Sequence, residues 1–300
     1  MIVQVENLWK KYGRFDALRG LSLGVPEGGV LSLIGANGAG KTTTLKVLMN
    51  LTEPTAGNVT LLGVDSRKLS PKQLARVGYV SENQRMPGRM TVAGYMAYLR
   101  PFYPEWDPVL AEDLLRQMHL PPDRKIGDLS HGMRIKMALA CALPFRPALL
   151  VMDEPFSGLD PLARDELIDG LKLRSGATTV LMSSHELAEV DDLTTDVAFL
   201  DRGKLLFQEP KRDLLARVKR VLVTLDRPLT RIPQLPAEWL DARIDGPVLT
   251  FVDTRFHAQD SPARIRTLLE GVSEIETQPI ELRAIYTTMA RAVRDPGSDS

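Results

Sequence analysis

Apolar residues in the first 210 positions form short runs that glycine loops and polar stretches separate. The first eight residues, MIVQVENL, alternate between apolar and polar side chains, which is typical of a half-buried strand. Two segments are almost continuously apolar, residues 30–34 (VLSLI) and residues 147–154 (PALLVMDE), the second of which ends in two acids. Such runs are typical of strands buried on both faces. Further strands are predicted at 58–63, 76–81 and 178–184, and a hairpin is predicted at 197–209 with Arg202 and Gly203 in its turn.

Helical segments alternate with these strands. Residues 41–51 (KTTTLKVLMNL) follow the strand at 30–34 through a glycine-rich loop, and this order of strand, loop and helix defines an α/β unit. Residues 91–127 are predicted to be mostly helical, with proline-rich breaks. Two more helices are predicted at 133–143 (MRIKMALACAL) and 166–173 (ELIDGLKL). The pattern therefore predicts an α/β fold with a parallel or mixed central sheet.

The composition changes after about residue 217. Strands are predicted at 219–225, 247–253 and 272–278, and helices at 261–271 and from Glu281 to Tyr286. We therefore divide the chain into a main domain at 1–217, with a helical subdomain at about 85–145, and a small α+β accessory domain at 218–290. Residues 291–300 are polar and are expected to form a disordered tail.

Charge and cysteine content exclude several classes of protein. The 38 basic and 38 acidic residues balance, which argues against nucleic-acid binding through a broad basic surface. The single cysteine, Cys141, excludes an internal disulfide and reads as a small buried hydrophobe. The first residues lack the basic and long apolar regions of a signal peptide, and no window approaches 18 uninterrupted apolar residues. We expect a cytoplasmic chain without a membrane span.

A phosphate-binding loop is the strongest motif. Residues 35–42 (GANGAGKT) match G-x-x-x-x-G-K-[ST] between an apolar strand and a helix, which is the context that this motif requires. Glycines let backbone N–H groups surround phosphate oxygens, and the start of the helix adds partial positive charge. Lys41 would reach the terminal phosphates, and the hydroxyl of Thr42 would bind Mg²⁺. The predicted nucleotide-binding residues of this segment are Gly35, Asn37, Gly38, Ala39, Gly40, Lys41, Thr42 and Thr43.

Two acids and a histidine follow buried strands and complete a candidate catalytic set. Asp153 and Glu154 end the strand at 147–154, and a strand that simply ends in solvent before Pro155 is the alternative. Beside a phosphate loop, Asp153 would hold Mg²⁺ and Glu154 would orient and polarise the attacking water. His185 follows the strand at 178–184, at the edge where ligands of open α/β sheets bind, and could contact the γ-phosphate. A lone histidine is otherwise most often a surface or satisfied core residue.

Residues 129–133 (LSHGM) place a turn-like Ser-His-Gly before an apolar helix. Ser130 is predicted to cap that helix. The segment belongs to an ordered set of motifs, GANGAGKTT, LSHGM, LLVMDEP, SGLD and SSHE, which resembles the ATP-binding subunits of ABC transporters over residues 1 to about 217. The resemblance implies a P-loop NTPase fold with a mixed or parallel core sheet, an antiparallel β subdomain and a helical subdomain. It also implies ATP hydrolysis with Mg²⁺ and a head-to-tail dimer.

The resemblance assigns further residues to the ATP site. Ser130 and Gly132 would contact the γ-phosphate of ATP bound to a partner subunit, which is compatible with the cap. Tyr12 would stack on adenine, or is an ordinary tyrosine at a strand end, and Asp160 belongs to the D-loop at 157–160. This chain departs from the family signature LSGGQ at His131 and Met133. It also carries Glu82 where the family has its Q-loop glutamine, and Gln84 follows two residues later. As the Q-loop residue, Glu82 is favoured by its position and Gln84 by its side chain, which can donate a hydrogen bond.

The resemblance to bacterial exporter subunits implies two partners. One is a second ATP-binding subunit, expected to be a copy of this chain, and the other is an integral membrane permease that holds the chain at the inner face of the cell membrane. Nucleic acid is not expected as a partner. Residues 82–106 would form the permease groove, with Met86, Met90, Tyr95, Tyr98 and Phe102 as apolar contacts or, equally, as subdomain core. The alternative function is a soluble ABC-type ATPase that acts on a cytoplasmic macromolecule, although the coiled-coil insertion or tandem domain typical of that class is absent from the sequence. The signature and D-loop argue against a third class, the metabolic kinases.

Overall fold

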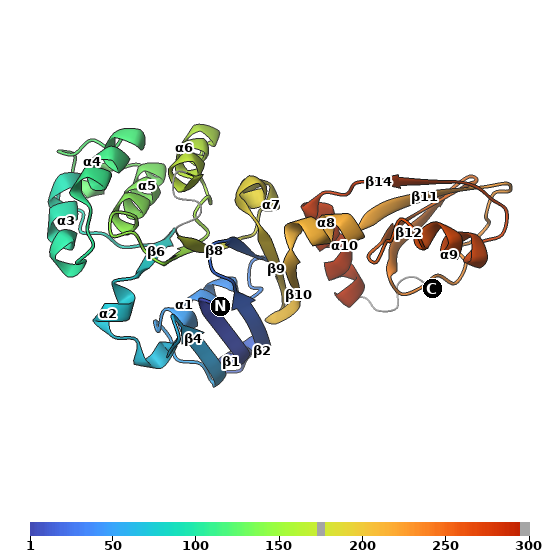
Figure 1. Cartoon of the computed structure of the whole chain (residues 1–300), viewed down its shortest axis with the longest axis horizontal. Coiled ribbons are helices and arrows are strands. Elements are labelled where there is room, and N and C mark those ends of the chain that lie inside the picture. Colours follow the sequence, from blue (N-terminus) through green and yellow to red (C-terminus); the bar gives the residue numbers. More distant parts are fainter. Residues whose placement is uncertain (173–177, 295–300) are drawn as a thin grey trace. The chain divides into compact units, whose positions relative to one another are not determined.

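The computed structural model describes residues 1–172 and 178–294, which form two compact units (Figure 1). The first unit runs from Met1 to Gln208 and the second starts at Glu209. The predicted boundary at 217 lies later because the helix α8, Lys211–Arg217, clusters with the second unit. Among the described residues, no helix is long and apolar enough to cross a membrane.

A six-stranded sheet forms the centre of the first unit, with the strand order β10-β9-β3-β8-β7-β6. The strands from β9 to β6 pair in parallel. The turn between β9 and β10 contains Arg202 and Gly203, both with positive φ, as predicted for the hairpin. These strands match the predicted ones closely: β3 Val30–Ile34, β6 Val77–Ser81, β7 Leu149–Asp153, β8 Thr179–Ser184, β9 Asp196–Asp201 and β10 Lys204–Pro210.

The central strands are buried on both faces, which explains their continuous apolar sequences. In β7, Leu149 and Val151 belong to one hydrophobic cluster, whereas Leu150 and Met152 belong to another. Because successive side chains of a strand point to opposite faces, these two clusters lie on the two sides of the sheet. The α/β fold class predicted from the sequence is confirmed.

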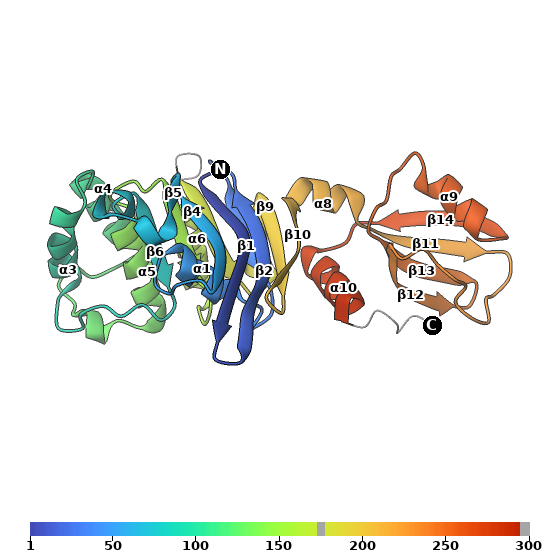
Figure 2. The same ribbon diagram turned by 90° about the horizontal axis from the view of Figure 1, so that it is seen from below.

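One face of the sheet packs with helix α1, Lys41–Leu48, and with a four-stranded antiparallel sheet of order β2-β1-β4-β5 (Figure 2). The sequence pattern predicts β1 and β4 but not β2, an eleven-residue strand. Bulges interrupt the register between β1 and β2, and Gly20 in β2 has φ +73, so the apolar alternation is broken. The strands of this sheet are β1 Val3–Tyr12, β2 Phe15–Val25, β4 Ala56–Leu61 and β5 Val64–Asp65.

The other face packs with a helical group (green in Figure 1). Helix α5 begins as predicted, because Ser130 Oγ accepts the backbone N–H of Met133 at 3.2 Å. Burial raises the pKa of the Cys141 thiol on this helix, which agrees with its interpretation as a hydrophobe. Besides α1, the α-helices described in the first unit are α2 Pro71–Leu74, α3 Val92–Leu99, α4 Pro108–Gln117, α5 His131–Ala142, α6 Pro161–Lys172 and α7 Leu187–Val190. The last residue of the predicted helix at 166–173 lies outside the described residues.

The second unit is a four-stranded antiparallel sheet of order β12-β13-β11-β14 with helices α8, α9 and α10. Its core joins one sheet face to α9 and contains Trp239 stacked on Phe251 at 4.2 Å between ring centroids. Strand β12 (WLDARID) was not predicted, since a bulge at Asp241, which has φ +51°, shifts its register and interrupts the apolar alternation. The elements are β11 Lys219–Leu225, β12 Trp239–Asp245, β13 Val248–Asp253, α9 Ser261–Leu268, β14 Val272–Gln278 and α10 Leu282–Arg294. Residues 291–294 of the expected tail are therefore helical, and 295–300 lie outside the described residues.

Helix α9 offers a matched test of this core. Ile265 is completely buried in it, whereas Leu268, on the same helix, is 49% exposed. We expect Ile265→Ala to lower the free energy of unfolding by about 2–5 kcal/mol. We expect Leu268→Ala to lower it by no more than about 1 kcal/mol. Urea denaturation followed by fluorescence measures both, and equal losses would contradict this packing.

Candidate functional site

The glycine-rich loop of residues 35–40 joins β3 to the start of α1. Gly38 and Gly40 have φ of +81° and +108°, a region that favours glycine. A Cβ on Gly40 would lie 2.7 Å from Leu18 Cδ2 and 2.9 Å from the Ala17 carbonyl oxygen, so the loop also needs glycine for space. The backbone thus turns tightly into the N-terminus of α1, and the first N–H groups of a helix lack intrahelical partners and suit a phosphate.

Lys41 carries the positive charge of this loop and is only 4% exposed. Its ammonium donates to the carbonyl oxygens of Gly35 at 2.6 Å and Ala36 at 3.3 Å, and Nζ lies 3.0 Å from Glu154 Oε1. A buried ammonium is tolerated only when it is paired and hydrogen-bonded, and these three oxygens provide both. The structure therefore brings two predicted catalytic residues, Lys41 and Glu154, into direct contact.

Asp153 lies beside Thr42 at the end of β7. Its Oδ1 accepts hydrogen bonds from Thr42 Oγ1 at 3.0 Å and from Ser183 Oγ at 2.8 Å, and the residue is 6% exposed. A hydroxyl and a carboxylate side by side are the hard oxygen ligands that Mg²⁺ prefers, and this ion usually takes its other ligands from water and substrate phosphates. Thr42 and Asp153 therefore fit a Mg²⁺ whose remaining ligands are phosphate and water. In the described part of the chain no three His, Cys, Asp or Glu side chains gather as a metal site.

Glu154 is held from two sides. Its Oε2 lies 2.7 Å from His185 Nδ1 and accepts the His185 backbone N–H at 3.2 Å, while its own N–H donates to Ser183 Oγ at 2.9 Å. Its φ is +52°, a conformation that costs a non-glycine residue free energy and that often occurs at functional sites. The neighbouring strands β7 and β8 thus bring Glu154 and His185, both expected at this edge of the sheet, into direct contact.

A cavity of about 300 Å³ opens over the loop, here called the phosphate-loop cavity. Tyr12 lines it together with Phe15, which the sequence analysis missed. The β1–β2 hairpin brings both aromatic residues to the same place, and they are 47% and 59% exposed. Exposed aromatic faces beside a phosphate loop suit a purine base. The lining residues are Tyr12, Phe15, Ala17, Asn37, Gly38, Ala39, Gly40, Lys41, Thr42, Thr43, Glu82 and Glu154.

The two alternative Q-loop residues separate in the structure. Glu82 lines the phosphate-loop cavity, and its N–H donates to the Asp153 carbonyl oxygen at 3.2 Å. Gln84 lines a different cavity of about 240 Å³, here called the aromatic cavity, and the structure does not bring it to the phosphate loop. As an ATP contact Gln84 stays a prediction, because in this conformation its side chain lines the aromatic cavity and not the phosphate-loop cavity.

The aromatic cavity lies among β6, α3 and α5. Tyr103 stacks on Phe145 there at 3.9 Å between ring centroids, and burial raises the pKa of Tyr95 and Tyr103, so their hydroxyls stay protonated. Gln84 Oε1 is buried without a hydrogen-bond partner. The lining residues are Met49, Leu74, Val77, Tyr79, Gln84, Tyr95, Leu99, Tyr103, Ala138, Cys141, Ala142 and Phe145.

Of the five apolar residues proposed for a permease groove, only Tyr95 lines the aromatic cavity. Met86 and Met90 pack against the helical core, which is the alternative role given to them. Tyr98 and Phe102 are 55% and 60% exposed and contact each other edge to face.

Ser130, Gly132 and Asp160 do not line the phosphate-loop cavity of their own chain. Ser130 caps α5, and Asp160 Oδ1 accepts the Ala163 N–H at 2.9 Å at the start of α6. A Cβ on Gly132 would lie 3.3 Å from Leu159 Cδ2, so glycine also permits the close packing of α5 against the D-loop. Their contact with ATP stays a prediction that requires a second chain.

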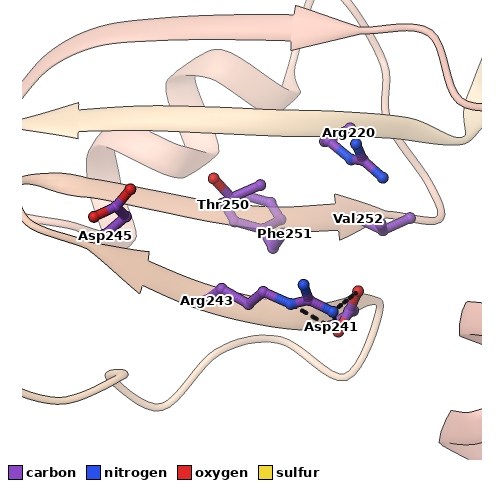
Figure 3. Close-up of a pocket in the computed structure, with 7 residues that line it drawn as sticks. All are labelled: Arg220, Asp241, Arg243, Asp245, Thr250, Phe251 and Val252. Carbon is purple, nitrogen blue, oxygen red and sulfur yellow. Dashed lines mark hydrogen bonds and ion pairs between the residues drawn. The ribbon is translucent and has the colours of Figure 1, made fainter.

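A further cavity of about 290 Å³ lies in the second unit (Figure 3). Arg243 pairs there with Asp241 at 3.0 Å, while Arg220 and Asp245 lie toward opposite ends of the sheet face. The charges of its two arginines and two aspartates compensate each other. None of the residues singled out in the sequence lines this cavity, whose remaining lining residues are Thr250, Phe251 and Val252.

Comparison with known proteins agrees with the geometry of the first unit. Residues 18–157 match the family described as ABC transporter. The chain is 30% identical to the daunorubicin resistance ATP-binding protein DrrA2 of Streptomyces coeruleorubidus, over 94% of this chain and 90% of that protein. It is 32% identical to the Nod factor export ATP-binding protein I of Cupriavidus metallidurans, over 71% and 73% of the two chains. A solved structure of the ATP binding subunit of an ABC transporter superposes with a TM-score of 0.66 at 26% identity, over 72% of this chain and 92% of that one.

The loop geometry can be tested with two glycine variants. Both Gly38→Ala and Gly40→Ala place a side chain at positive φ, but only the second creates overlap, because nothing lies within 4 Å of a Cβ on Gly38. We expect Gly40→Ala to lower the free energy of unfolding by about 1–3 kcal/mol more than Gly38→Ala does. Chemical denaturation measures the difference, and equal stability of the two variants would contradict the close approach at Gly40.

Proposed function

Because the chain belongs to the ABC transporter family and is an ATP-hydrolysing subunit, we propose that it powers export of a small molecule through a separate membrane permease. The observation that carries this proposal is the pair of cavities in the first unit. The phosphate-loop cavity suits ATP, and the aromatic cavity suits a helical segment of a permease. The similarity to a drug resistance protein over nearly the whole chain, accessory unit included, supports export as the direction.

Within the ATP site, Glu154 is the proposed general base. Its carboxylate contacts Lys41 at one oxygen and His185 at the other. Phosphate oxygens would compete for the Lys41 ammonium, which frees Glu154 Oε1 to accept a proton from water, while His185 keeps the carboxylate oriented. Bound Mg²⁺ would neutralise phosphate charge, and Thr42 and Asp153 are the residues that would hold it.

A second copy of the chain is the proposed partner in the ATP site. Ser130 and Gly132 stand at the N-terminus of the twelve-residue helix α5, where backbone N–H groups and the helix dipole favour an anion. The Ser130 residue is exposed, so a phosphate bound to another chain has access to it. ATP would then join two chains by contacts that exist only in the closed dimer, which is how a ligand shifts such an equilibrium.

The aromatic cavity is the proposed docking site for the permease, which would hold the chain at the inner face of the cell membrane. Its rings offer apolar area, and the unpartnered Gln84 Oε1 offers an acceptor to a donor on the incoming segment. The cavity also connects to the ATP site along the chain, because Gln84 follows Glu82 by two residues.

Glu154→Gln tests the catalytic assignment. Glutamine keeps the size and polarity of the side chain but cannot accept the proton, so we expect ATP binding to be retained and steady-state turnover to fall about 10²–10⁴-fold. Glu186→Gln is the matched control, since that carboxylate is 62% exposed and lies 4.0 Å from His185 Nε2. Phosphate release with purified protein measures both, and near-normal turnover in Glu154→Gln would remove Glu154 as the base.

Leu74→Asp tests the docking site. Leu74 lines the aromatic cavity and is 38% exposed, so a charge there disturbs docking more than folding. We expect the variant to hydrolyse ATP at a rate within about twofold of the unchanged chain but to lose the co-purifying polytopic membrane protein. Val109→Asp, at an apolar position of α4 that is 67% exposed, should keep that partner.

The assay is affinity purification of the tagged chain from detergent-solubilised membranes of its host, followed by mass spectrometry. Retention of the same membrane protein by Leu74→Asp would contradict the docking site. Recovery of only ribosomes, DNA or soluble proteins by the unchanged chain would contradict the transporter function itself.

A further inference from the structure

One side chain of this chain's signature segment reaches the D-loop. His131 is the first residue of α5, and its Nε2 lies 3.1 Å from the backbone carbonyl oxygen of Ser157. A carbonyl oxygen only accepts hydrogen bonds, so Nε2 must carry the proton. The imidazole also lies against the turn that follows, since a Cβ on Gly158 would be 3.5 Å from the same nitrogen.

Ser157 continues the connection toward the ATP site of its own chain. Its hydroxyl donates to Glu82 Oε1 at 3.3 Å, and its N–H donates to the Glu154 carbonyl oxygen at 3.3 Å. Glu82 in turn lines the phosphate-loop cavity. Two side-chain hydrogen bonds therefore lead from the start of α5, through Ser157, to the edge of the phosphate loop.

We propose that His131 is a positioning residue that links the two ATP sites of the dimer through Ser157 and Glu82. This inference rests on the proposed function, in which the N-terminus of α5 contacts ATP held by the partner. A displacement of α5 toward that ATP then pulls on the Ser157 carbonyl, and Ser157 moves against Glu82 at the other site. The residue at position 131 makes this link only if its side chain can donate to the carbonyl, which histidine does and alanine does not.

The test is the steady-state ATPase activity of His131→Ala, His131→Gln, Ser157→Ala and the double variant His131→Ala/Ser157→Ala. The link affects turnover only when α5 contacts the partner's ATP, so loss of this hydrogen bond should lower kcat about fivefold to tenfold in His131→Ala and leave the KM for ATP within about twofold. His131→Gln keeps an N–H donor of similar reach and should restore kcat to within about twofold of the unchanged chain.

The double variant separates a serial link from two independent losses. If His131 and Ser157 act along one connection, the double variant should be no slower than the slower single variant, whereas independent effects would multiply. His257→Gln, in the second unit, is the matched histidine control and should keep kcat unchanged.

Three results would overturn the link: unchanged kcat in His131→Ala, no rescue by His131→Gln, or multiplied losses in the double variant. If His131→Ala does not fold, two other variants still test the link. The link requires a near-normal kcat in His131→Gln and a lowered kcat in Ser157→Ala. Failure of the proposed function would give a different result from failure of the link. The unchanged chain would not hydrolyse ATP, or Glu154→Gln would hydrolyse it at the normal rate.

Discussion

The burial of the Lys41 ammonium is the constraint on which the site depends. A charge that is 4% exposed must be compensated by fixed oxygens, and here three oxygens come from two segments that are distant in sequence. The loop after β3 offers two carbonyl groups, and the end of β7 offers Glu154. Parallel pairing of β7, β8 and β3 places these ends at one sheet edge, where Asp153, Thr42 and His185 also lie. The fold therefore gathers the carboxylates of Asp153 and Glu154 and the ammonium of Lys41 at one place that suits phosphate.

In the proposed dimer, one chain supplies only part of each ATP site. Tyr12, Phe15, Lys41 and Glu154 line the phosphate-loop cavity, whereas Ser130, which resembles a γ-phosphate contact, lies elsewhere as a helix cap. Two departures of this chain from the family motifs, Glu82 and His131, have a shared consequence. Glu82 accepts a hydrogen bond from Ser157, and His131 donates to the same residue, so the two unusual side chains meet at the D-loop.

The sequence predicted most of the first unit because its signals are local. Strands β3, β7 and β8 are apolar on both faces, and the loop at 35–42 has a spacing that phosphate binding requires. What it missed depends on tertiary contacts. Strand β2 contains glycines and bulges, Phe15 reaches the cavity only through its pairing with Tyr12, and Gln84 turns to a second cavity although it is two residues from Glu82. Strand β12 loses its alternation because a bulge, with Asp241 at φ +51°, shifts the register between Leu240 and Arg243.

The central claim is that two copies of this chain complete each other's ATP sites. The most direct measurement is the molar mass of the Glu154→Gln chain by light scattering after size-exclusion chromatography, with and without Mg-ATP. The account predicts 33.3 kDa without nucleotide and about twice that mass with it, and return to the single mass when Ser130→Arg is added. A mass that stays at 33.3 kDa while ATP binds, or a dimer that Ser130→Arg leaves intact, would contradict it.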